Sequence, residues 1–365
     1  MKIPLTFAKY IGKHFILGVG VVFCLVVGII ILFDMLELVG RASNKNIPFG
    51  IIFEMVLLKL PFIIQKIIPF AILLGGILSF SRLTRTSELI VARAAGVSAW
   101  QFLAPAIIIS FLLGAFIITI FNPLSAIMLA KYEQVEAKYF QGNSSMISVS
   151  STGLWLKQNN HDTKSKMIIH ALRLSKGDTK LFDVTVFMFG ENNRFIQRID
   201  APSATLEDGY WYINDAILTM PGQPAARRSD YRLRTTLSAH EIQESFASPE
   251  TISFWELPGF IKTLKEAGFS ALRHTLYWHK VLVTPFMLSA MVFFAAAFSL
   301  RPPRQGKTGM LMTGGIFAGF IIYFISDVVS AVGLSGSIPI MMAAWAPVVI
   351  STLLGAVLML HLEDG

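Results

Sequence analysis

The sequence is poor in charged residues and nearly free of cysteine. Only 15% of its 365 residues are Asp, Glu, Lys or Arg, whereas 54% are hydrophobic. Soluble proteins carry about 25% charged residues, so this shortage of charge indicates a membrane protein. The single cysteine, Cys24, excludes a disulfide within the chain.

The sequence also lacks a complete nucleotide-binding, metal-binding or catalytic motif. Residues Gly306-Lys307-Thr308 resemble the end of a phosphate-binding loop, but Arg301 stands where that loop requires glycine. His274 and His279 do not have the i,i+4 spacing of metal ligands on a helix. No Ser/His/Asp or Cys/His arrangement has a supporting motif. We therefore expect a non-catalytic chain with no metal and no cofactor of its own.

Long apolar runs dominate what is present. A helix needs about 20 residues to cross the hydrocarbon core of a membrane, and most of the runs approach or exceed this length. They predict six transmembrane helices, three before and three after a long polar segment. The runs are Ile11–Phe33, Ile51–Phe80, Phe102–Phe121, Val281–Leu300, Met310–Ile325 and Ile338–Leu360.

The basic residues, which give a net charge of +8, stand at the ends of these runs. This arrangement is the positive-inside pattern, and it predicts a multi-pass inner-membrane protein with both termini in the cytoplasm. Because the charge is spread over membrane boundaries, we do not expect nucleic-acid binding. The cytoplasmic basic residues are Lys2, Lys9, Lys13, Arg82, Arg85, Arg93, Arg301, Arg304 and Lys307.

The long polar segment, residues 129–278, lies on the opposite side in this topology, which is the periplasm of a Gram-negative cell. Short runs such as Leu181–Phe189 and Trp211–Leu218 are rich in aromatic and branched residues, and turn signals separate them. This spacing predicts an all-β, jelly-roll-like domain. The predicted fold is therefore an α-helical membrane bundle, residues 1–128 and 279–365, plus a periplasmic β domain. A capping box at Ser253–Glu256 predicts a helix near the end of that domain.

Between the second and third runs lies a charged, helix-forming segment, residues 82–98. Thr84 or Thr86 can cap a helix, Glu88 then falls in its first turn, and Gly96 is suited to end it. A short amphipathic helix at the membrane face suits binding by a soluble partner. Two interpretations of Glu88 stay open at this point, namely insertion into a pocket of the partner or simple solvation.

Charged and aromatic residues in the spans also leave two interpretations open. Charges at membrane depth either pair with each other and with lipid headgroups, or contact an anionic lipid substrate. The aromatic residues either line a cavity for acyl chains or serve ordinary helix packing. The charged residues are Asp34, Glu37, Arg41, Lys45, Glu54, Lys59 and Lys66, and the aromatic residues are Phe33, Phe62, Phe317, Phe320, Tyr323 and Phe324.

Several motifs resemble the lipopolysaccharide-export ABC-transporter permeases, the F- and G-type subunits, and are most similar to the G type. The resemblance covers essentially the whole chain. Its sharpest motif is Ser87-Glu88-Leu89 through Ala95-Gly96-Val97-Ser98, which matches the coupling helix of that family. Other matching segments are Tyr10-Ile11-Gly12-Lys13, Pro69 through Leu73-Leu74-Gly75, Gly153-Leu154-Trp155 and Ile338-Pro339.

The resemblance implies a set of partners and a division of labour. In that family an F-type and a G-type permease form a heterodimer over a cytoplasmic ATPase dimer (LptB-like), which binds ATP and Mg²⁺. A single-span periplasmic-bridge protein (LptC-like) binds beside the first span. Lipopolysaccharide enters from the inner membrane and passes through the jelly-rolls towards the outer membrane. The implied coupling helix covers residues 82–97, with Glu88, Arg85, Ser87, Leu89, Arg93 and Gly96 as ATPase-coupling residues.

The outer half and end of the first run differ from the G-type pattern, because relatives carry lysines there whereas the stretch Ile29–Glu37 has no basic residue. We therefore expect headgroup contacts from Arg41, Lys45, Lys59 and Lys66, and acyl-chain contacts from Phe33, Phe62, Phe317, Phe320 and Tyr323. Two rival functions remain, namely a proton-driven secondary transporter and a membrane scaffold for the β domain. Asp327 is the one candidate proton carrier for the former.

Overall fold

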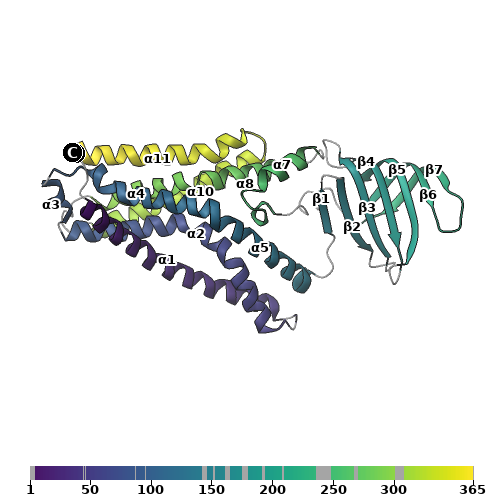
Figure 1. Cartoon of the computed structure of the whole chain (residues 1–365), viewed down its shortest axis with the longest axis horizontal. Helices are drawn as coiled ribbons and strands as arrows, with labels where there is room; N and C mark the ends of the chain where they lie inside the picture. Colours follow the sequence, from purple (N-terminus) through teal and green to yellow (C-terminus); the bar gives the residue numbers. More distant parts are fainter. Residues whose placement is uncertain are drawn as a thin grey trace. The chain divides into compact units, whose positions relative to one another are not determined.

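The computed structural model describes residues 5–43, 45, 47–86, 88–94, 96–141, 146–150, 153–160, 165–174, 180–190, 194–207, 209–235, 248–266, 270–300 and 308–364. The chain forms two compact units (Figure 1). The helical unit comprises Met1–Tyr132, Ser253–Trp255 and Thr275–Gly365, and the β unit comprises Glu133–Ile252 and Glu256–His274. The predicted β domain, residues 129–278, contains the whole β unit together with the short segment Ser253–Trp255.

Long apolar helices make up the helical unit. Five helices within the described residues are long and apolar enough to cross a membrane, and there are six if α8 and α9, a pair bent by 52°, form one span. The predicted membrane bundle is therefore confirmed. The helices are α1 (Leu5–Ala42), α2 (Phe49–Arg85), α3 (Glu88–Ala94), α4 (Ala99–Phe116), the π-helix η1 (Ile117–Phe121), α5 (Asn122–Glu136), α8 (Leu272–Leu282), α9 (Thr284–Ser299), α10 (Thr308–Leu334) and α11 (Ile340–Asp364).

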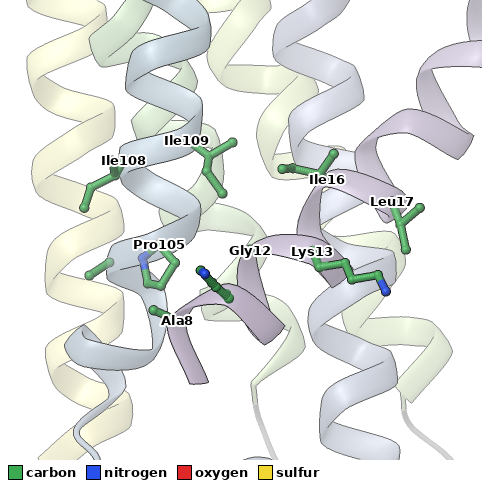
Figure 2. Close-up of a pocket in the computed structure, with 10 residues that line it drawn as sticks. Ala8, Gly12, Lys13, Ile16, Leu17, Pro105, Ile108 and Ile109 are labelled. Carbon is green, nitrogen blue, oxygen red and sulfur yellow. The ribbon is translucent and has the colours of Figure 1, made fainter. Parts of the chain in front are cut away.

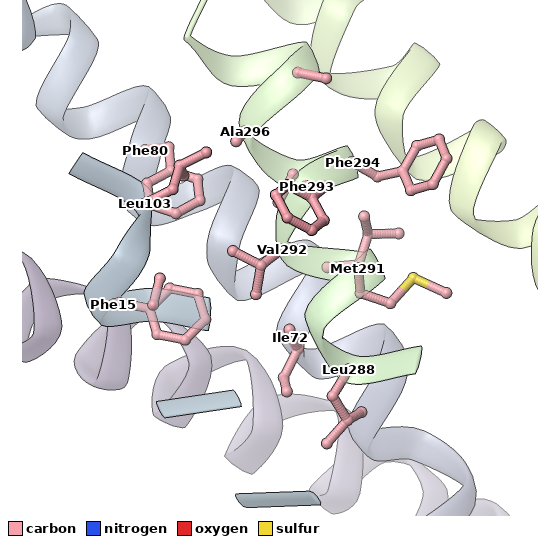
Figure 3. Close-up of a cluster of buried hydrophobic side chains, with 14 of the residues drawn as sticks. Phe15, Ile72, Phe80, Leu103, Leu288, Met291, Val292, Phe293, Phe294 and Ala296 are labelled. Atoms are coloured by element: carbon pink, nitrogen blue, oxygen red, sulfur yellow. The ribbon is translucent and has the colours of Figure 1, made fainter. Parts of the chain in front are cut away.

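Helix α9 is the centre of the helical unit. It is buried along nearly its whole length and packs against α2, α4, α10 and α11. Figure 3 shows Leu288, Met291 and Val292 of α9 in the same cluster as Phe80 of α2 and Leu103 of α4. A helix that is apolar on all sides is expected at such a central position. Helix α9 alone, with 16 residues, is too short to span the membrane.

Helix α1 contacts its neighbour α2 through glycines. A methyl group built on Gly75 would overlap the Val19 backbone, lying 2.7 Å from its nitrogen, and one built on Gly18 would lie 2.8 Å from the Gly75 carbonyl oxygen. The two backbones can approach this closely only because neither glycine has a side chain. Between helices in lipid, such close packing replaces the hydrophobic force that is absent there.

One buried amide joins four segments of the helical unit. Asn122 donates from Nδ2 to Gln65 Oε1 of α2 (3.2 Å) and to Tyr277 Oη of α8 (3.1 Å). Its Oδ1 accepts a hydrogen bond from the Phe254 amide at 2.8 Å. These bonds satisfy both donors and one acceptor of a fully buried side chain, so they fix the returning chain against α5.

The helix predicted to begin at Ser253 begins later, because the preceding residues are held by the helical unit. Phe254 stacks on Trp278 with ring centroids 5.9 Å apart, and Trp255 Nε1 donates to the Thr119 carbonyl (3.3 Å). Helix α7 (Leu257–Glu266) therefore starts only after this anchor.

The β unit is one antiparallel sheet whose strands pair in sequence order. The all-β prediction is confirmed, although the described strands form a meander, whereas a jelly-roll also contains Greek-key crossovers. Leu264 of α7 packs into the apolar face of the sheet. The strands are β1 (Met146–Ser150), β2 (Gly153–Asn160), β3 (Ser165–Leu174), β4 (Lys180–Phe189), β5 (Phe195–Glu207), β6 (Tyr210–Thr219) and β7 (Ala226–Arg234), and the short helices η2 (Ala137–Gln141) and η4 (Pro249–Thr251) complete the unit.

A row of irregular residues interrupts the ladder pairing across three central strands. Asp183 of β4 and Asp215 of β6 have positive φ angles of 53° and 54°. Both are unpaired at the level of Pro202 in β5. Proline donates no hydrogen bond to its neighbours, and aspartate tolerates the left-handed conformation better than most residues. The three residues therefore leave a local gap in the ladder pairing, and the register is the same on either side of it.

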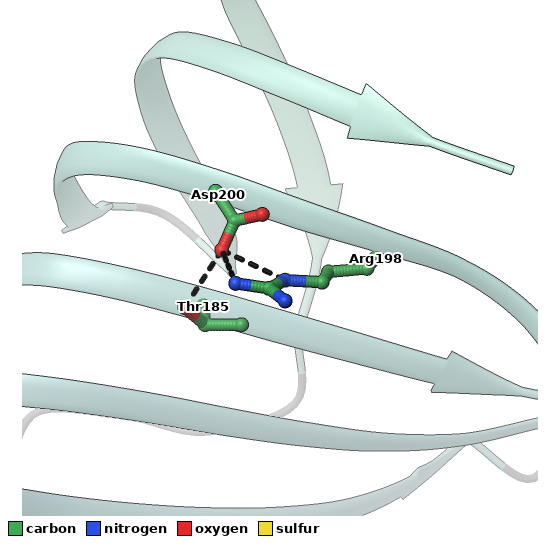
Figure 4. Close-up of polar contacts among 3 residues, drawn as sticks. All are labelled: Thr185, Arg198 and Asp200. Carbon is green, nitrogen blue, oxygen red and sulfur yellow. Dashed lines mark hydrogen bonds and ion pairs between the residues drawn. The ribbon is translucent and has the colours of Figure 1, made fainter. Parts of the chain in front are cut away.

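On the face opposite the apolar one, a polar network crosses β4 and β5 (Figure 4). Thr185 Oγ1 donates to Asp200 Oδ1 (2.9 Å), and Arg198 donates to the same oxygen from Nε (2.9 Å) and Nη2 (2.7 Å). Arg198 also lies over the Phe187 ring, 5.7 Å from its centroid. Exposed cross-strand pairs of this kind contribute about 0.2–1 kcal/mol each.

The close approach of α1 to α2 generates a first prediction. We expect Gly75→Ala to lower the stability of the helical unit by about 1–3 kcal/mol, because the added methyl group must push the Val19 backbone away. Thermal unfolding of the purified protein in detergent measures the loss. Gly28→Ala is the matched control, since a methyl group there meets no atom within 4 Å. Equal melting temperatures for both variants would contradict the proposed close contact.

Candidate functional site

The charged segment after α2 is built differently from the single helix predicted over residues 82–97. Helix α2 continues through Arg85, and the separate helix α3 starts at Glu88. Neither predicted threonine caps the start of α3. Thr84 Oγ1 donates to the carbonyls of Phe80 (2.9 Å) and Ser299 (3.0 Å), and Thr86 is the C-terminal cap of α2.

Glu88 lies half-buried at the start of α3, between two hydroxyl groups. Thr86 Oγ1 donates to Glu88 Oε1 at 2.9 Å, and the Tyr10 hydroxyl of α1 donates a side-chain hydrogen bond to the same carboxylate. The carboxylate is therefore oriented by two elements instead of standing clear of them. The contact with Tyr10 was not predicted from the sequence, although Tyr10 belongs to a matching motif.

The end of α3 agrees with the prediction from Gly96. This glycine has a φ of +84°, and the Val97 amide donates to the Ala92 carbonyl at 3.0 Å. The pattern is that of a Schellman motif, in which glycine takes the left-handed position after the helix. Arg85 is exposed in the last turn of α2. Ser87 and the side chains of Leu89 and Arg93 lie outside the described residues.

A buried ion pair joins α1 to α2 near their connecting loop. Lys59 Nζ donates to Asp34 Oδ1, and Lys59 also lies 5.7 Å from the Tyr132 ring centroid. Asp34 is only 7% exposed, and its Oδ2 has no hydrogen-bond partner among the described residues. Lys59 is thus paired internally, which was one of the two interpretations open from the sequence.

The other three basic candidates are exposed. Lys66 lies over the Phe62 ring, 4.4 Å from its centroid. Arg41 is in the last turn of α1, and Lys45 is in the turn that follows. Arg41 and Lys45 therefore lie close together in sequence at one end of α1.

The aromatic candidates fall into separate groups. Phe320 and Tyr323 of α10 both contact Phe70 of α2, with ring centroids 5.6 and 4.8 Å apart. Phe317 and Phe33 are 66% and 69% exposed, and they lie on different helices, α10 and α1. Among the described residues, Phe33 is thus exposed on α1, and Phe317 and Phe320 are exposed on α10.

Metal binding has no candidate site among the described residues, where no group of three or more His, Cys, Asp or Glu side chains comes together. His279 instead accepts a hydrogen bond at Nδ1 from Trp345 Nε1 (3.4 Å), and His274 packs on Phe260 with ring centroids 5.1 Å apart. Each histidine has a packing role in its own unit.

Comparison with known proteins identifies the family. Residues 9–361 match the model of the lipopolysaccharide export system permease LptF/LptG. The lipopolysaccharide export system permease protein LptG of Escherichia coli K12 is 25% identical over 355 residues, which cover 93% of each chain. The protein of the same description from Haemophilus influenzae is 22% identical over 358 residues, or 94% of each chain. The chain therefore belongs to the LptF/LptG family of lipopolysaccharide export system permeases.

Proposed function

We propose that this chain is the G-type permease of an exporter that moves lipopolysaccharide from the inner membrane to a periplasmic bridge. The observation that carries the proposal is the family match over nearly the whole chain, together with the curated relatives, which are G-type proteins. The chain is a non-catalytic subunit of this ABC transporter, so the ATP and Mg²⁺ belong to a separate ATPase dimer, which is LptB-like. The remaining partners are an F-type permease and a single-span, LptC-like protein.

The topology follows from the basic residues that flank the spans. Both termini and α3 lie in the cytoplasm, and the β unit lies in the periplasm. The predicted domain limits, 1–128, 129–278 and 279–365, separate these compartments. Helix α3 then faces the ATPase dimer, and the strands continue the path of the lipid beyond the membrane.

Glu88 is the proposed contact with the ATPase. Its carboxylate is pre-oriented by Thr86 and Tyr10, so less conformational entropy is lost when a partner binds it. Because Tyr10 belongs to α1, a displacement of α3 reaches that helix directly. Arg85, Ser87, Leu89, Arg93 and Gly96 complete the proposed coupling surface.

The lipid contacts are divided between charge and apolar area. Arg41, Lys45, Lys59 and Lys66 orient the phosphorylated headgroup. Burial of acyl chains against the exposed faces of α1 and α10 supplies most of the affinity, at about 0.8 kcal/mol per methylene. The aromatic residues proposed for the acyl chains are Phe33 of α1, Phe62 of α2, and Phe317, Phe320 and Tyr323 of α10.

A proton-driven mechanism receives no support from the geometry of its candidate acid. Asp327 forms an ion pair with Lys280 at 3.0 Å, and both side chains are at least a third exposed. Such a pair is ordinary for two neighbouring helices near a membrane boundary.

The coupling role of Glu88 gives a second prediction. We expect Glu88→Ala to reduce recovery of the co-expressed ATPase about tenfold, because hydrogen bonds to a charged group contribute about 1.5–3 kcal/mol. Co-purification from detergent-solubilised membranes measures the recovery. Glu207→Ala, which removes the same charge from the end of β5, should leave it unchanged.

Tyr10→Phe sharpens this test, because it removes only the hydroxyl group that holds the carboxylate. We expect ATPase binding to persist and lipid export per ATP hydrolysed to fall. Full ATPase recovery with Glu88→Ala would disprove the assignment of α3 as the coupling helix.

The headgroup contacts give a third prediction. We expect Arg41→Gln with Lys45→Gln to weaken binding of phosphorylated lipopolysaccharide about tenfold, since each basic residue near a membrane surface contributes about 1 kcal/mol. Asp34→Asn should act in the opposite direction, because it removes the charge that neutralises Lys59. Binding of lipopolysaccharide and of a dephosphorylated form to the purified complex measures both effects. Equal losses for the two lipids would contradict headgroup recognition by these residues.

A further inference from the structure

A groove between α1 and α4 has none of the roles assigned so far. It has a volume of about 650 Å³, and Figure 2 shows Ile16 of α1 and Ile109 of α4 on its two sides, with Gly12 of α1 near Pro105 of α4. Its lining is apolar except at one end, where Lys9 and Lys13 stand exposed. Small residues at Ala8, Gly12, Ala104 and Pro105 leave the space between the helices open.

A second apolar cavity, of about 550 Å³, continues the groove along the same two helices. The two cavities share Ile16 and Ile109, and the second ends near Phe23 of α1 and Phe116 of α4. From Lys13 to Phe23, α1 rises roughly 15 Å, which is about half the thickness of the hydrocarbon core. The continuous groove therefore has the depth of one leaflet.

The groove also holds a buried hydroxyl group. Ser110 lines the second cavity, is fully buried, and has no hydrogen-bond partner for Oγ among the described residues. A buried hydroxyl without a partner is costly in an apolar setting. A lipid has an ester carbonyl close to its charged headgroup. This carbonyl would accept a hydrogen bond from the Ser110 hydroxyl group.

We propose that the α1–α4 groove binds a phospholipid with an anionic headgroup from the cytoplasmic leaflet. Its phosphate contacts Lys9 and Lys13, an ester carbonyl accepts from Ser110, and an acyl chain fills the apolar part. Basic pockets between membrane helices on the cytoplasmic side commonly hold such headgroups. The site is separate from the proposed export path, because Lys13 and Arg41 are roughly 40 Å apart along α1.

The position of the site connects it to the coupling segment. Tyr10 lies in the same turns of α1 as Lys9 and Lys13, and its hydroxyl group holds Glu88. A lipid bound to both α1 and α4 would thereby restrict the motion of the α1 turn that contains Tyr10, and Tyr10 in turn interacts with Glu88. The binding proposal itself does not depend on the role of Glu88, so the two can fail separately.

Lipid binding to the delipidated full-length protein, in complex with its partner subunits, tests the proposal by native mass spectrometry. The probes are phosphatidylglycerol and phosphatidylcholine with identical oleoyl chains. We expect phosphatidylglycerol to bind about tenfold more tightly, and Lys9→Gln with Lys13→Gln to abolish the difference. The control Lys262→Gln with Lys265→Gln, in α7, should keep it. Equal binding of the two lipids, or an undiminished preference in the Lys9/Lys13 variant, would overturn the proposal.

A photoreactive benzophenone residue in place of Ile108 identifies the occupant directly. Ile108 lines the groove and is 58% exposed, so the replacement fits without repacking the core. We expect a mass increase equal to one phospholipid after irradiation in membranes. A cross-link to a protein chain, or the absence of any phospholipid adduct, would overturn the proposal.

Discussion

The attachment of α1 to α2 is the contact on which the other functional regions depend. Lipid provides no hydrophobic force between helices, so α1 must be held by close packing and by polar contacts. Backbone contact at Gly18 and Gly75 provides the close packing in the middle of the helix. The Asp34–Lys59 pair provides a polar contact to α2 towards one end of α1, and the interaction of Tyr10 with Glu88 ties the other end to α3. The rest of α1 is largely exposed, so these points set its position.

This arrangement makes α1 a rigid connection between the two sides of the membrane. From Tyr10 to Asp34 the helix rises roughly 36 Å, and no proline interrupts it. A displacement of α3 can therefore reach the outer end without local unfolding. The chain after α4 behaves differently, because the π-helix η1 interrupts the regular hydrogen bonding before Asn122. Asn122 compensates by fixing α5, α2, α8 and the Phe254 segment to one another.

The sequence predicts those features that depend on local pattern. The length of the apolar runs predicts the membrane-spanning helices. The spacing of short apolar runs and turn residues predicts the strands, and Gly96 predicts the end of α3. The start of the helix after α2 was expected at Thr84 or Thr86, but α2 continues through Arg85 and α3 starts at Glu88, and no proline or glycine marks the boundary. The helix at Ser253 was misplaced because distant residues hold its first turn. The left-handed residues Asp183 and Asp215 and the pair of Asp34 with Lys59 depend on positions far apart in sequence, so periodicity carries no signal for them.

The Asp34–Lys59 pair places two opposite charges next to each other in a largely apolar helix pair. The pair is not built for maximal stability, because Asp34 Oδ2 is buried without a partner. Replacing such a pair by apolar residues is often neutral or stabilising. Its value here is positional, since it fixes the register of α1 on α2 and can open when α1 moves.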